Sequence, residues 1–205
     1  MLKKSPNLLC IFSRYPEAGR CKTRLIPTLG AEGAAFLQRQ MTEHIIKEGQ
    51  QASCDLLLCL NGGRPDTIES WLGSELDYIT QQGDDLGDRM LYGFQDGFAR
   101  GYQNIVLVGA DCPTIDSSLL DEGFAALASH NLVLGPTVDG GYYLIGLNEM
   151  YPSLFAGIDW GMNQVLAQTM AIGHDLNPEL LVTLHDVDSP EDLMALPSFL
   201  HKQQF

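Results

Sequence analysis

The stretch NIVLVGADCPT, residues 104–114, decides the fold that we expect from the sequence. Residues 105–108 are all apolar and lack the polar alternation of a strand with one face in water, so they predict a strand buried on both faces. Runs of the same kind recur at 7–13 (NLLCIFS), 54–60 (CDLLLCL) and 132–135 (LVLG). Buried strands of this type are typical of a parallel sheet with helices on both faces.

The segments between these runs carry apolar residues at helical spacing, which predicts one buried helix face in each segment. The three stripes are Ala34, Leu37, Met41 and Ile45; Met90, Phe94 and Phe98; and Leu120, Phe124 and Leu127. Shorter elements are expected at 65–72 (helix), 77–80 (strand) and 142–147 (a strand close to residue 132). The pattern predicts a single α/β domain over residues 1–205, with its ligand at the carboxyl ends of the strands.

The acidic composition limits the partners that we expect. The 26 acidic and 12 basic residues give a formal charge of −14, which repels nucleic acid. The sequence lacks the roughly eighteen consecutive apolar residues of a membrane span, and its N-terminal apolar run is too short for a signal peptide. Five cysteines without a C-x-x-C pair fit neither a disulfide framework nor a structural zinc site. We therefore expect a cytoplasmic protein with no nucleic-acid or membrane partner.

Positive charge is concentrated just after the first predicted strand. Four basic residues lie within eleven positions there: Arg14, Arg20, Lys22 and Arg24. Such a loop suits an anion, because Gly19 lets backbone N–H groups approach phosphate oxygens beside these cations. The alternative is a solvated surface loop. The segment matches neither a Walker A loop nor a G-x-G-x-x-G fingerprint.

Asp111 is the first candidate for holding a divalent cation. It follows the buried strand at 105–109 directly, and Mg²⁺ often takes only one or two carboxylate ligands from a protein. Helix capping is the alternative function of this residue. Asp116 or Ser117 is the better cap for the helix that follows, so Asp111 has no structural task in the sequence.

A second acidic segment lies at 185–192. Ser189 predicts a helix start, with Asp192 three residues later resembling a capping box. This interpretation leaves Asp186 and Asp188 unexplained.

The sequence Asp139-Gly140-Gly141 stands between the strands expected at 132–135 and 142–147. A tight hairpin turn uses such a sequence, and a ligand contact is the alternative. The two are compatible, because a turn of this kind leaves room for a bound group.

These segments together resemble the nucleotide-diphospho-sugar transferase superfamily, whose fold is of the glycosyltransferase-A type. GRCKTRLIP at 19–27 is similar to the G-x-G-T-R-[LM]-x-P loop that binds phosphates in sugar-phosphate nucleotidyltransferases. GADCP at 109–113 resembles the strand-end aspartate that holds Mg²⁺, and VDSPEDL at 187–193 resembles the segment with the second metal ligand. FSRYPEAGRCKTRL at 12–25, GDDLGDRM at 83–90 and GPTVDGGYYLIGL at 135–147 also resemble the selenodomain-associated transferase family, related to MobA-like and phospholactate guanylyltransferase-like nucleotidyltransferases.

The chain departs from the sugar-nucleotidyltransferase pattern at specific positions. Cys21-Lys22 replaces the second glycine of the loop and its neighbour, and no second lysine follows Pro27. The D-x-D typical of glycosyltransferases is missing at the central strand. The resemblance therefore leaves the base and the acceptor unidentified.

The resemblance implies a three-layer α/β/α sandwich with a mostly parallel sheet, in which residues 1–135 bind the nucleotide and residues 136–205 form the acceptor side and C-terminal part. It implies Mg²⁺ or Mn²⁺ at Asp111 and Asp188, with Asp186 or Asp139 as alternative second ligands. The expected catalytic residues are Lys22, Arg24 and Asp111. The expected substrate-binding residues are Arg14, Gly19, Arg20, Lys22, Thr23, Arg24, Asp85, Leu86, Gly87, Arg89, Asp139, Gly140, Gly141 and Tyr142.

The reaction that we expect is nucleotidyl transfer from a nucleoside triphosphate to a phosphorylated small-molecule acceptor, with release of pyrophosphate. Such chemistry needs positioning and charge neutralisation more than covalent participation by the protein. Glycosyl transfer from a nucleotide sugar, with a base near Asp139, is the alternative on the same fold. A nucleotide-binding regulator without turnover is a third possibility. The basic loop favours a triphosphate, because a diphosphate carries less charge.

Overall fold

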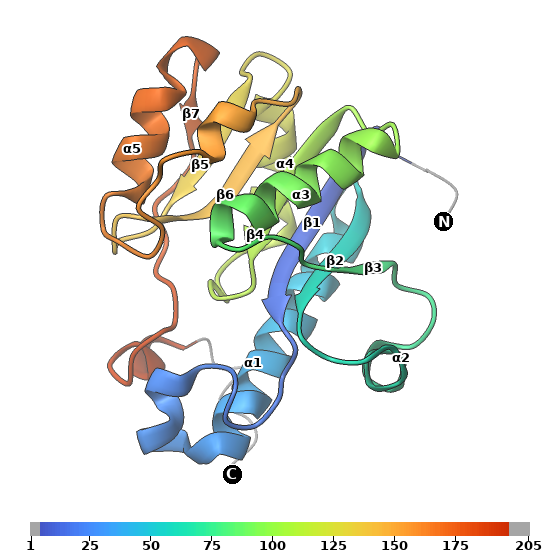
Figure 1. The fold of residues 1–205 in the computed structure, drawn as a ribbon, viewed down its shortest axis with the longest axis vertical. Coiled ribbons are helices and arrows are strands. Elements are labelled where there is room, and N and C mark those ends of the chain that lie inside the picture. Colours follow the sequence, from blue (N-terminus) through green and yellow to red (C-terminus); the bar gives the residue numbers. More distant parts are fainter. Residues whose placement is uncertain (1–4, 197–205) are drawn as a thin grey trace.

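The computed structural model describes residues 5–196, and seven strands of that part form one sheet (Figure 1). The strand order is β3-β2-β1-β4-β6-β5-β7. Their bounds are β1 Asn7–Arg14, β2 Asp55–Asn61, β3 Tyr78–Thr80, β4 Asn104–Gly109, β5 Leu132–Pro136, β6 Tyr142–Leu147 and β7 Glu179–Leu180.

The sheet is mostly parallel, as the buried runs predict. β1 pairs in parallel with β2 and β4, whereas β6 runs antiparallel to both β4 and β5. Leu132 of β5 lies opposite Leu147 of β6, which confirms the predicted pairing of these two segments. The carboxyl ends of β1, β2 and β4 therefore meet at one edge of the sheet, where open α/β sheets bind their ligands.

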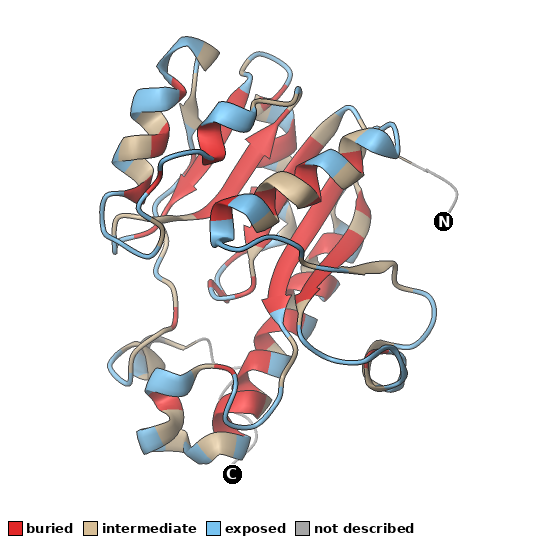
Figure 2. Cartoon of the chain, in the orientation of Figure 1, coloured by how far each residue is buried: buried red, intermediate tan, exposed pale blue. Residues whose placement is uncertain are grey.

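Helices cover both faces of this sheet. α1 (Ile26–Gln51), α2 (Pro65–Leu72) and α4 (Ser117–Ala126) pack on one face, and α3 (Leu86–Ala99) and α5 (Val165–Ile172) pack on the other. The side chains between the layers are buried (Figure 2). This arrangement is the expected three-layer sandwich. No helix within residues 5–196 is both long enough and apolar enough to span a membrane.

The predicted helix stripes face the core. Met41, Ile45 and Phe94 are each 0% exposed. The helix that carries the first of these stripes begins at Ile26, eight residues before Ala34, with a break at Gly30, where φ is +72°. The Asp116 carboxylate caps α4 by accepting a hydrogen bond from the Leu119 N–H at 2.9 Å, which leaves Asp111 free of that task.

A small third core lies apart from the two sheet faces. Leu25, Leu37 and Met41, from the first turn after the basic loop and from α1, bury the side chain of Val187. The C-terminal segment runs from β7 toward the N-terminal half of α1 (Figure 1). This packing brings residues 186–188 beside the carboxyl ends of β1 and β4.

Candidate active site

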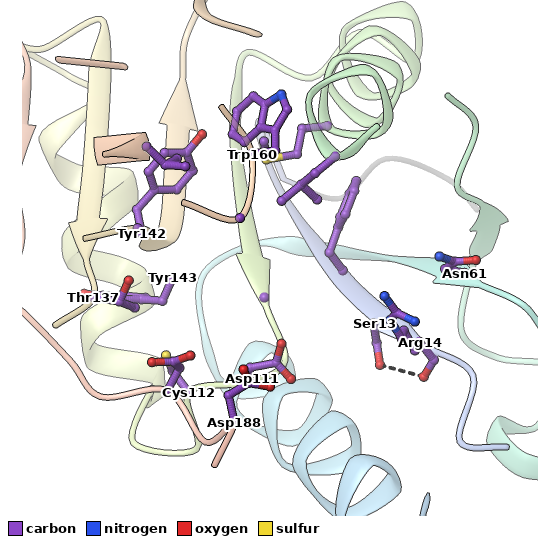
Figure 3. Close-up of a pocket in the computed structure, with 18 of the residues that line it drawn as sticks. Ser13, Arg14, Asn61, Asp111, Cys112, Thr137, Tyr142, Tyr143, Trp160 and Asp188 are labelled. Atoms are coloured by element: carbon purple, nitrogen blue, oxygen red, sulfur yellow. Dashed lines mark hydrogen bonds between the residues drawn. The ribbon is translucent and has the colours of Figure 1, made fainter. Parts of the chain in front are cut away.

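A pocket of about 580 Å³ opens at the carboxyl ends of the central strands. Residues from β1, the basic loop, the end of β4, the β5–β6 turn and the C-terminal segment line it together (Figure 3). Many of the residues that the sequence predicts as site residues lie in this lining: Arg14, Arg20, Lys22, Thr23, Arg24, Leu86, Arg89, Asp111, Asp139, Gly141, Tyr142 and Asp188. The structure therefore brings the basic loop and the strand-end aspartate into one cavity.

Lys22 reaches across the pocket from the loop to the end of β4. Its Nζ lies 2.7 Å from Asp111 Oδ1 and donates a hydrogen bond to the backbone carbonyl of Val187. The Lys22 side chain is only 5% exposed, whereas that of Asp111 is 53% exposed. The ammonium group is thus enclosed between a carboxylate and a carbonyl, and the carboxylate keeps one side open to the pocket.

The backbone of Lys22 has an unusual conformation that makes this reach possible. Its φ and ψ are both 45°, in the left-handed region, which residues other than glycine rarely adopt. The position lies directly before Thr23-Arg24, where the resembling loops have Gly before Thr-Arg. The chain thus keeps a backbone conformation that glycine favours, while adding a cation to it.

The segment at 186–188 presents two carboxylates to the pocket. Asp186 and Asp188 line the cavity, while Val187 between them is 4% exposed and packs in the small third core. The Val187 N–H donates to the backbone oxygen of Asp111 at 2.9 Å. Arg24 forms an ion pair with Asp188 through its Nη1. The loop therefore contacts both predicted metal ligands with a cation.

Asp192 fixes the end of this segment. Its carboxylate accepts hydrogen bonds from the Asp188 N–H, the Ser189 N–H and the Ser189 hydroxyl. Burial raises the Asp192 pKa, but these hydrogen bonds outweigh it, and the net pKa is lowered. The helix predicted to start at Ser189 is a short 3-10 turn over Asp192–Ala195 whose N-cap is Glu191, so the hydrogen bond from the Ser189 N–H to Asp192 fixes the segment just before this turn.

The pocket holds closely spaced negative charge. Burial raises the pKa of Asp186, and the charge of Asp139 raises it further. Burial also raises the pKa of the Cys112 thiol, and the neighbouring charges of Asp186 and Asp111 act in the same direction. Cys112 is therefore a neutral packing residue at neutral pH and has no thiolate to act as a nucleophile.

Asp139 contributes both to the turn and to the pocket. Its Oδ1 accepts hydrogen bonds from the Thr137 hydroxyl and from the Gly141 N–H, the latter at 3.0 Å. Asp139 and Gly141 also line the cavity. The hairpin role and contact with the pocket thus hold together.

The remaining predicted site residues lie outside the lining of the main pocket. Gly19 lines a neighbouring cavity of about 360 Å³ behind the loop. Asp85 caps α3 by accepting from the Asp88 N–H at 2.9 Å. Gly87 packs against Trp160, whose Nε1 would lie 2.5 Å from an added Cβ, and Gly140 is enclosed in the same way by the Asn163 carbonyl at 2.1 Å. These positions shape the walls of the site through backbone and packing.

The sequence motifs miss several residues that line the pocket. Gln38 is 3% exposed on α1 and donates through Nε2 to the Ser13 hydroxyl at 3.1 Å. Gln38 lies between Ala34 and Met41 of the apolar stripe. A polar residue at such a position is the feature of the sequence that could have identified it. Trp160 lies near the N-terminus of α3 at the opposite end of the cavity from Asp111 (Figure 3), and no motif points to it.

The donor set suits a hard divalent cation. Asp111, Asp186 and Asp188 supply carboxylate oxygens in one cavity, which are the ligands that Mg²⁺ and Mn²⁺ prefer. Among residues 5–196, no three His, Cys, Asp or Glu side chains are grouped as a ready-made metal site.

Solved structures share this architecture. A provisionally named nucleotide-diphospho-sugar transferase from Desulfovibrio desulfuricans G20 is 34% identical, with a TM-score of 0.87 over 90% of this chain and 83% of the other. CMP:2-keto-3-deoxy-manno-octonic acid synthetase complexed with CTP is 10% identical, with a TM-score of 0.61 over 97% and 99% of the two chains. A Mycobacterium tuberculosis H37Rv protein in complex with manganese is 15% identical, with a TM-score of 0.58 over 96% and 99%. No functionally curated protein matches the sequence.

The mostly parallel sheet and these neighbours define a protein with the nucleotide-diphospho-sugar transferase fold. This result confirms the superfamily that the loop, the strand-end aspartate and the C-terminal segment predict. The chain belongs to the DUF2064 family, described as an uncharacterized protein conserved in bacteria, which matches residues 45–162.

Proposed function

We propose that this protein is a divalent-metal-dependent nucleotidyltransferase. An oxygen of a phosphorylated small-molecule acceptor attacks the α-phosphorus of a nucleoside triphosphate. The bond from the α-phosphorus to the bridging oxygen breaks, and pyrophosphate leaves. The observation that carries the proposal is the convergence of Arg14, Lys22 and Arg24 with Asp111 and Asp188 in one pocket.

The basic loop supplies the charge that a triphosphate requires. Arg14 and Arg24 are exposed at the pocket and have guanidinium groups that bind phosphate oxygens in a bidentate manner. Lys22 adds a point charge at the end of β4. In a protein with a formal charge of −14, this local concentration of cations favours the most highly charged substrate, which is a triphosphate rather than the diphosphate of a nucleotide sugar.

Asp111 and Asp188 are the groups that would hold Mg²⁺ or Mn²⁺, with Asp186 beside them. When bound, such a cation neutralises charge on phosphate oxygens as the leaving group departs. The manganese in the Mycobacterium tuberculosis neighbour supports a divalent metal on this fold. The CTP in the synthetase neighbour supports a nucleoside triphosphate as the substrate class.

The acceptor lies on the other side of the cavity, in the part formed by residues after 135. Asp139, Gly141, Tyr142 and Trp160 line that side. The hydrogen bonds of the Asp139 turn keep the Asp139 Oδ1 occupied, and its second carboxylate oxygen is available to orient the acceptor. Nucleotide and acceptor thereby meet over the ends of β1 and β4, where positioning alone accounts for much of the rate.

Pyrophosphate release tests this proposal. The purified protein, Mg²⁺ and each of the four common nucleoside triphosphates are first screened by thermal shift, because ligand at a hundred times its Kd adds about 2.7 kcal/mol to the free energy of unfolding. The stabilising nucleotide is then assayed for pyrophosphate with a panel of phosphorylated acceptors. Acceptor-dependent pyrophosphate is the expected result.

Two other outcomes would replace the proposal. Hydrolysis of a nucleotide sugar, without pyrophosphate from any triphosphate, would assign glycosyl transfer. Nucleotide binding with neither activity would assign a regulator. In the assay, Asp175→Asn is the matched control for Asp111→Asn, because the Asp175 side chain is 86% exposed and pairs with His174 outside the pocket lining.

A further inference from the structure

Both predicted metal ligands of the pocket carry an internal cation. Lys22 Nζ lies 2.7 Å from Asp111 Oδ1, and Arg24 forms an ion pair with Asp188. The two basic residues are separated only by Thr23 and belong to the same loop. The pairing therefore joins the two loop cations to the carboxylates on which the proposed metal depends.

The position of the Lys22 ammonium conflicts with a divalent cation on the same carboxylate. A cation bound at Asp111 would lie within a few ångströms of Nζ, and like charges at that separation repel strongly in a partly enclosed site. The Lys22 side chain is 5% exposed, so water screens this repulsion little. Asp111 can accept the metal fully only when Lys22 leaves it or when added negative charge offsets the repulsion.

A polyphosphate supplies that negative charge. Lys22 and Arg24 line the same pocket as Asp111 and Asp188, so phosphate oxygens that enter it compete with the two carboxylates for the two cations. When one of these cations pairs with a phosphate oxygen instead, its former carboxylate partner is no longer neutralised and can bind the metal. By linkage, the metal must then strengthen polyphosphate binding by the same factor.

We infer that Lys22 and Arg24 act as internal counter-ions that weaken binding of a divalent metal to the free protein, so that metal and triphosphate each strengthen the binding of the other. This inference rests on the proposed function, because it concerns the same pocket. It goes further in assigning each loop cation two successive partners: a carboxylate in the free protein and a phosphate oxygen in the complex. The free protein is therefore expected to hold little metal before the triphosphate binds.

The test measures the affinity of the nucleotide-free protein for Mn²⁺. The electron paramagnetic resonance signal of unbound Mn²⁺ monitors the titration. We expect wild-type protein to bind Mn²⁺ weakly and Lys22→Met to bind it at least about tenfold more tightly, within the usual range of coupling between sites. The same substitution should weaken binding of inorganic tripolyphosphate in EDTA. Tighter Mn²⁺ binding together with weaker tripolyphosphate binding is the result expected if Lys22 pairs with Asp111 in the free protein and with a phosphate oxygen in the complex.

Two further variants show whether a gain in Mn²⁺ affinity comes from loss of an ion pair with a metal ligand. The alternatives are a change in the net charge of the loop and a disturbed fold. Arg24→Met removes the cation of the exposed pair, whose Arg24 side chain is 76% exposed, so it should tighten Mn²⁺ binding without disturbing the fold. Arg20→Met removes a cation of the same loop that pairs with Glu17 rather than with a predicted metal ligand. It should change Mn²⁺ affinity far less, and an effect equal to that of Lys22→Met would contradict the inference.

Unchanged or weaker Mn²⁺ binding in both Lys22→Met and Arg24→Met would overturn the inference. Adding Asp111→Asn to Lys22→Met should abolish the gain, and a gain that persists would place the metal elsewhere and also overturn it. The proposed function is judged separately by pyrophosphate release. A protein that releases pyrophosphate, yet shows no gain of Mn²⁺ affinity in either variant, keeps that function and loses only the counter-ion exchange.

Discussion

The basic loop contacts the aspartates of the pocket in two ion pairs that differ in burial. Lys22 joins Asp111 with a side chain that is 5% exposed, and it also binds the Val187 carbonyl. Arg24 joins Asp188 through side chains that are 76% and 42% exposed, respectively. The first contact holds the loop, the end of β4 and the C-terminal segment together, whereas the second is an exposed pair of the kind that contributes little to stability. In the free protein, the Lys22 contact therefore also has a structural role, which the Arg24 contact lacks.

The largest expected effect comes from the carboxylate of the enclosed contact. Asp111→Asn should reduce acceptor-dependent pyrophosphate release by on the order of a hundredfold or more, because metal-stabilised charge is worth several kcal/mol in the transition state. Steady-state kinetics at saturating nucleotide measures the loss. Asp188→Asn should lower the rate in the same assay. A rate for Asp111→Asn within a factor of two of wild type would remove Asp111 from the machinery.

Removing the enclosed cation should act on nucleotide affinity. Lys22→Ala is expected to weaken triphosphate binding in the presence of Mg²⁺ by about 1.5–3 kcal/mol, the scale of a hydrogen bond to a charged group. Isothermal titration calorimetry with the nucleotide selected by thermal shift measures this change. Equal affinity of the wild-type and variant proteins would show that the loop does not cradle the phosphates.

The two contacts should also differ in what they contribute to folding. Lys22→Ala leaves the Val187 carbonyl without its hydrogen bond and should lower the free energy of unfolding by about 1–3 kcal/mol. Arg24→Ala breaks an exposed pair and should lower it by no more than about 1 kcal/mol. Urea denaturation of both variants gives the comparison. If Arg24→Ala proved the more destabilising of the two, the assignment of a structural role to Lys22 would be wrong.

The smallest effect concerns Asp186, which has a raised pKa because of burial and the charge of Asp139. The folded state then holds the proton more strongly than the unfolded state, so ionisation of Asp186 opposes folding above the ordinary aspartate pKa. This loss of stability is present at neutral pH and disappears as the pH falls through the raised pKa. Asp186→Asn should therefore slightly increase stability at pH 7 and flatten its pH dependence just above the ordinary aspartate pKa. Chemical denaturation across that range, without added metal, tests the sign.

Much of the fold is predictable because local patterns and burial agree. The apolar runs around Ile11 and Leu107 are buried strands, and the Asp116 cap begins α4 as capping rules predict. The common location of the loop and Asp111 is also predictable, since parallel strands place their carboxyl ends at one edge.

The long-range details of the site are not predictable in this way. The contact between Lys22 and Val187 joins residues 165 positions apart, and it depends on how the C-terminal segment packs on α1. The left-handed backbone of Lys22 contradicts the local preference of lysine. Gly87 belongs to a segment that resembles a binding motif, yet its lack of a side chain is what admits the Trp160 ring. Such features arise from tertiary packing, which no spacing of residues along the chain encodes.

The most direct measurement of the central claim is a crystal structure with Mn²⁺ and a non-hydrolysable analogue of the nucleotide chosen by thermal shift. The anomalous signal of manganese locates the metal independently of the interpretation of the nucleotide. We expect the manganese peak between the carboxylates of Asp111 and Asp188, with Lys22 Nζ on a phosphate oxygen instead of Asp111 Oδ1. A manganese peak away from both aspartates, or a triphosphate bound away from the basic loop, would contradict the account.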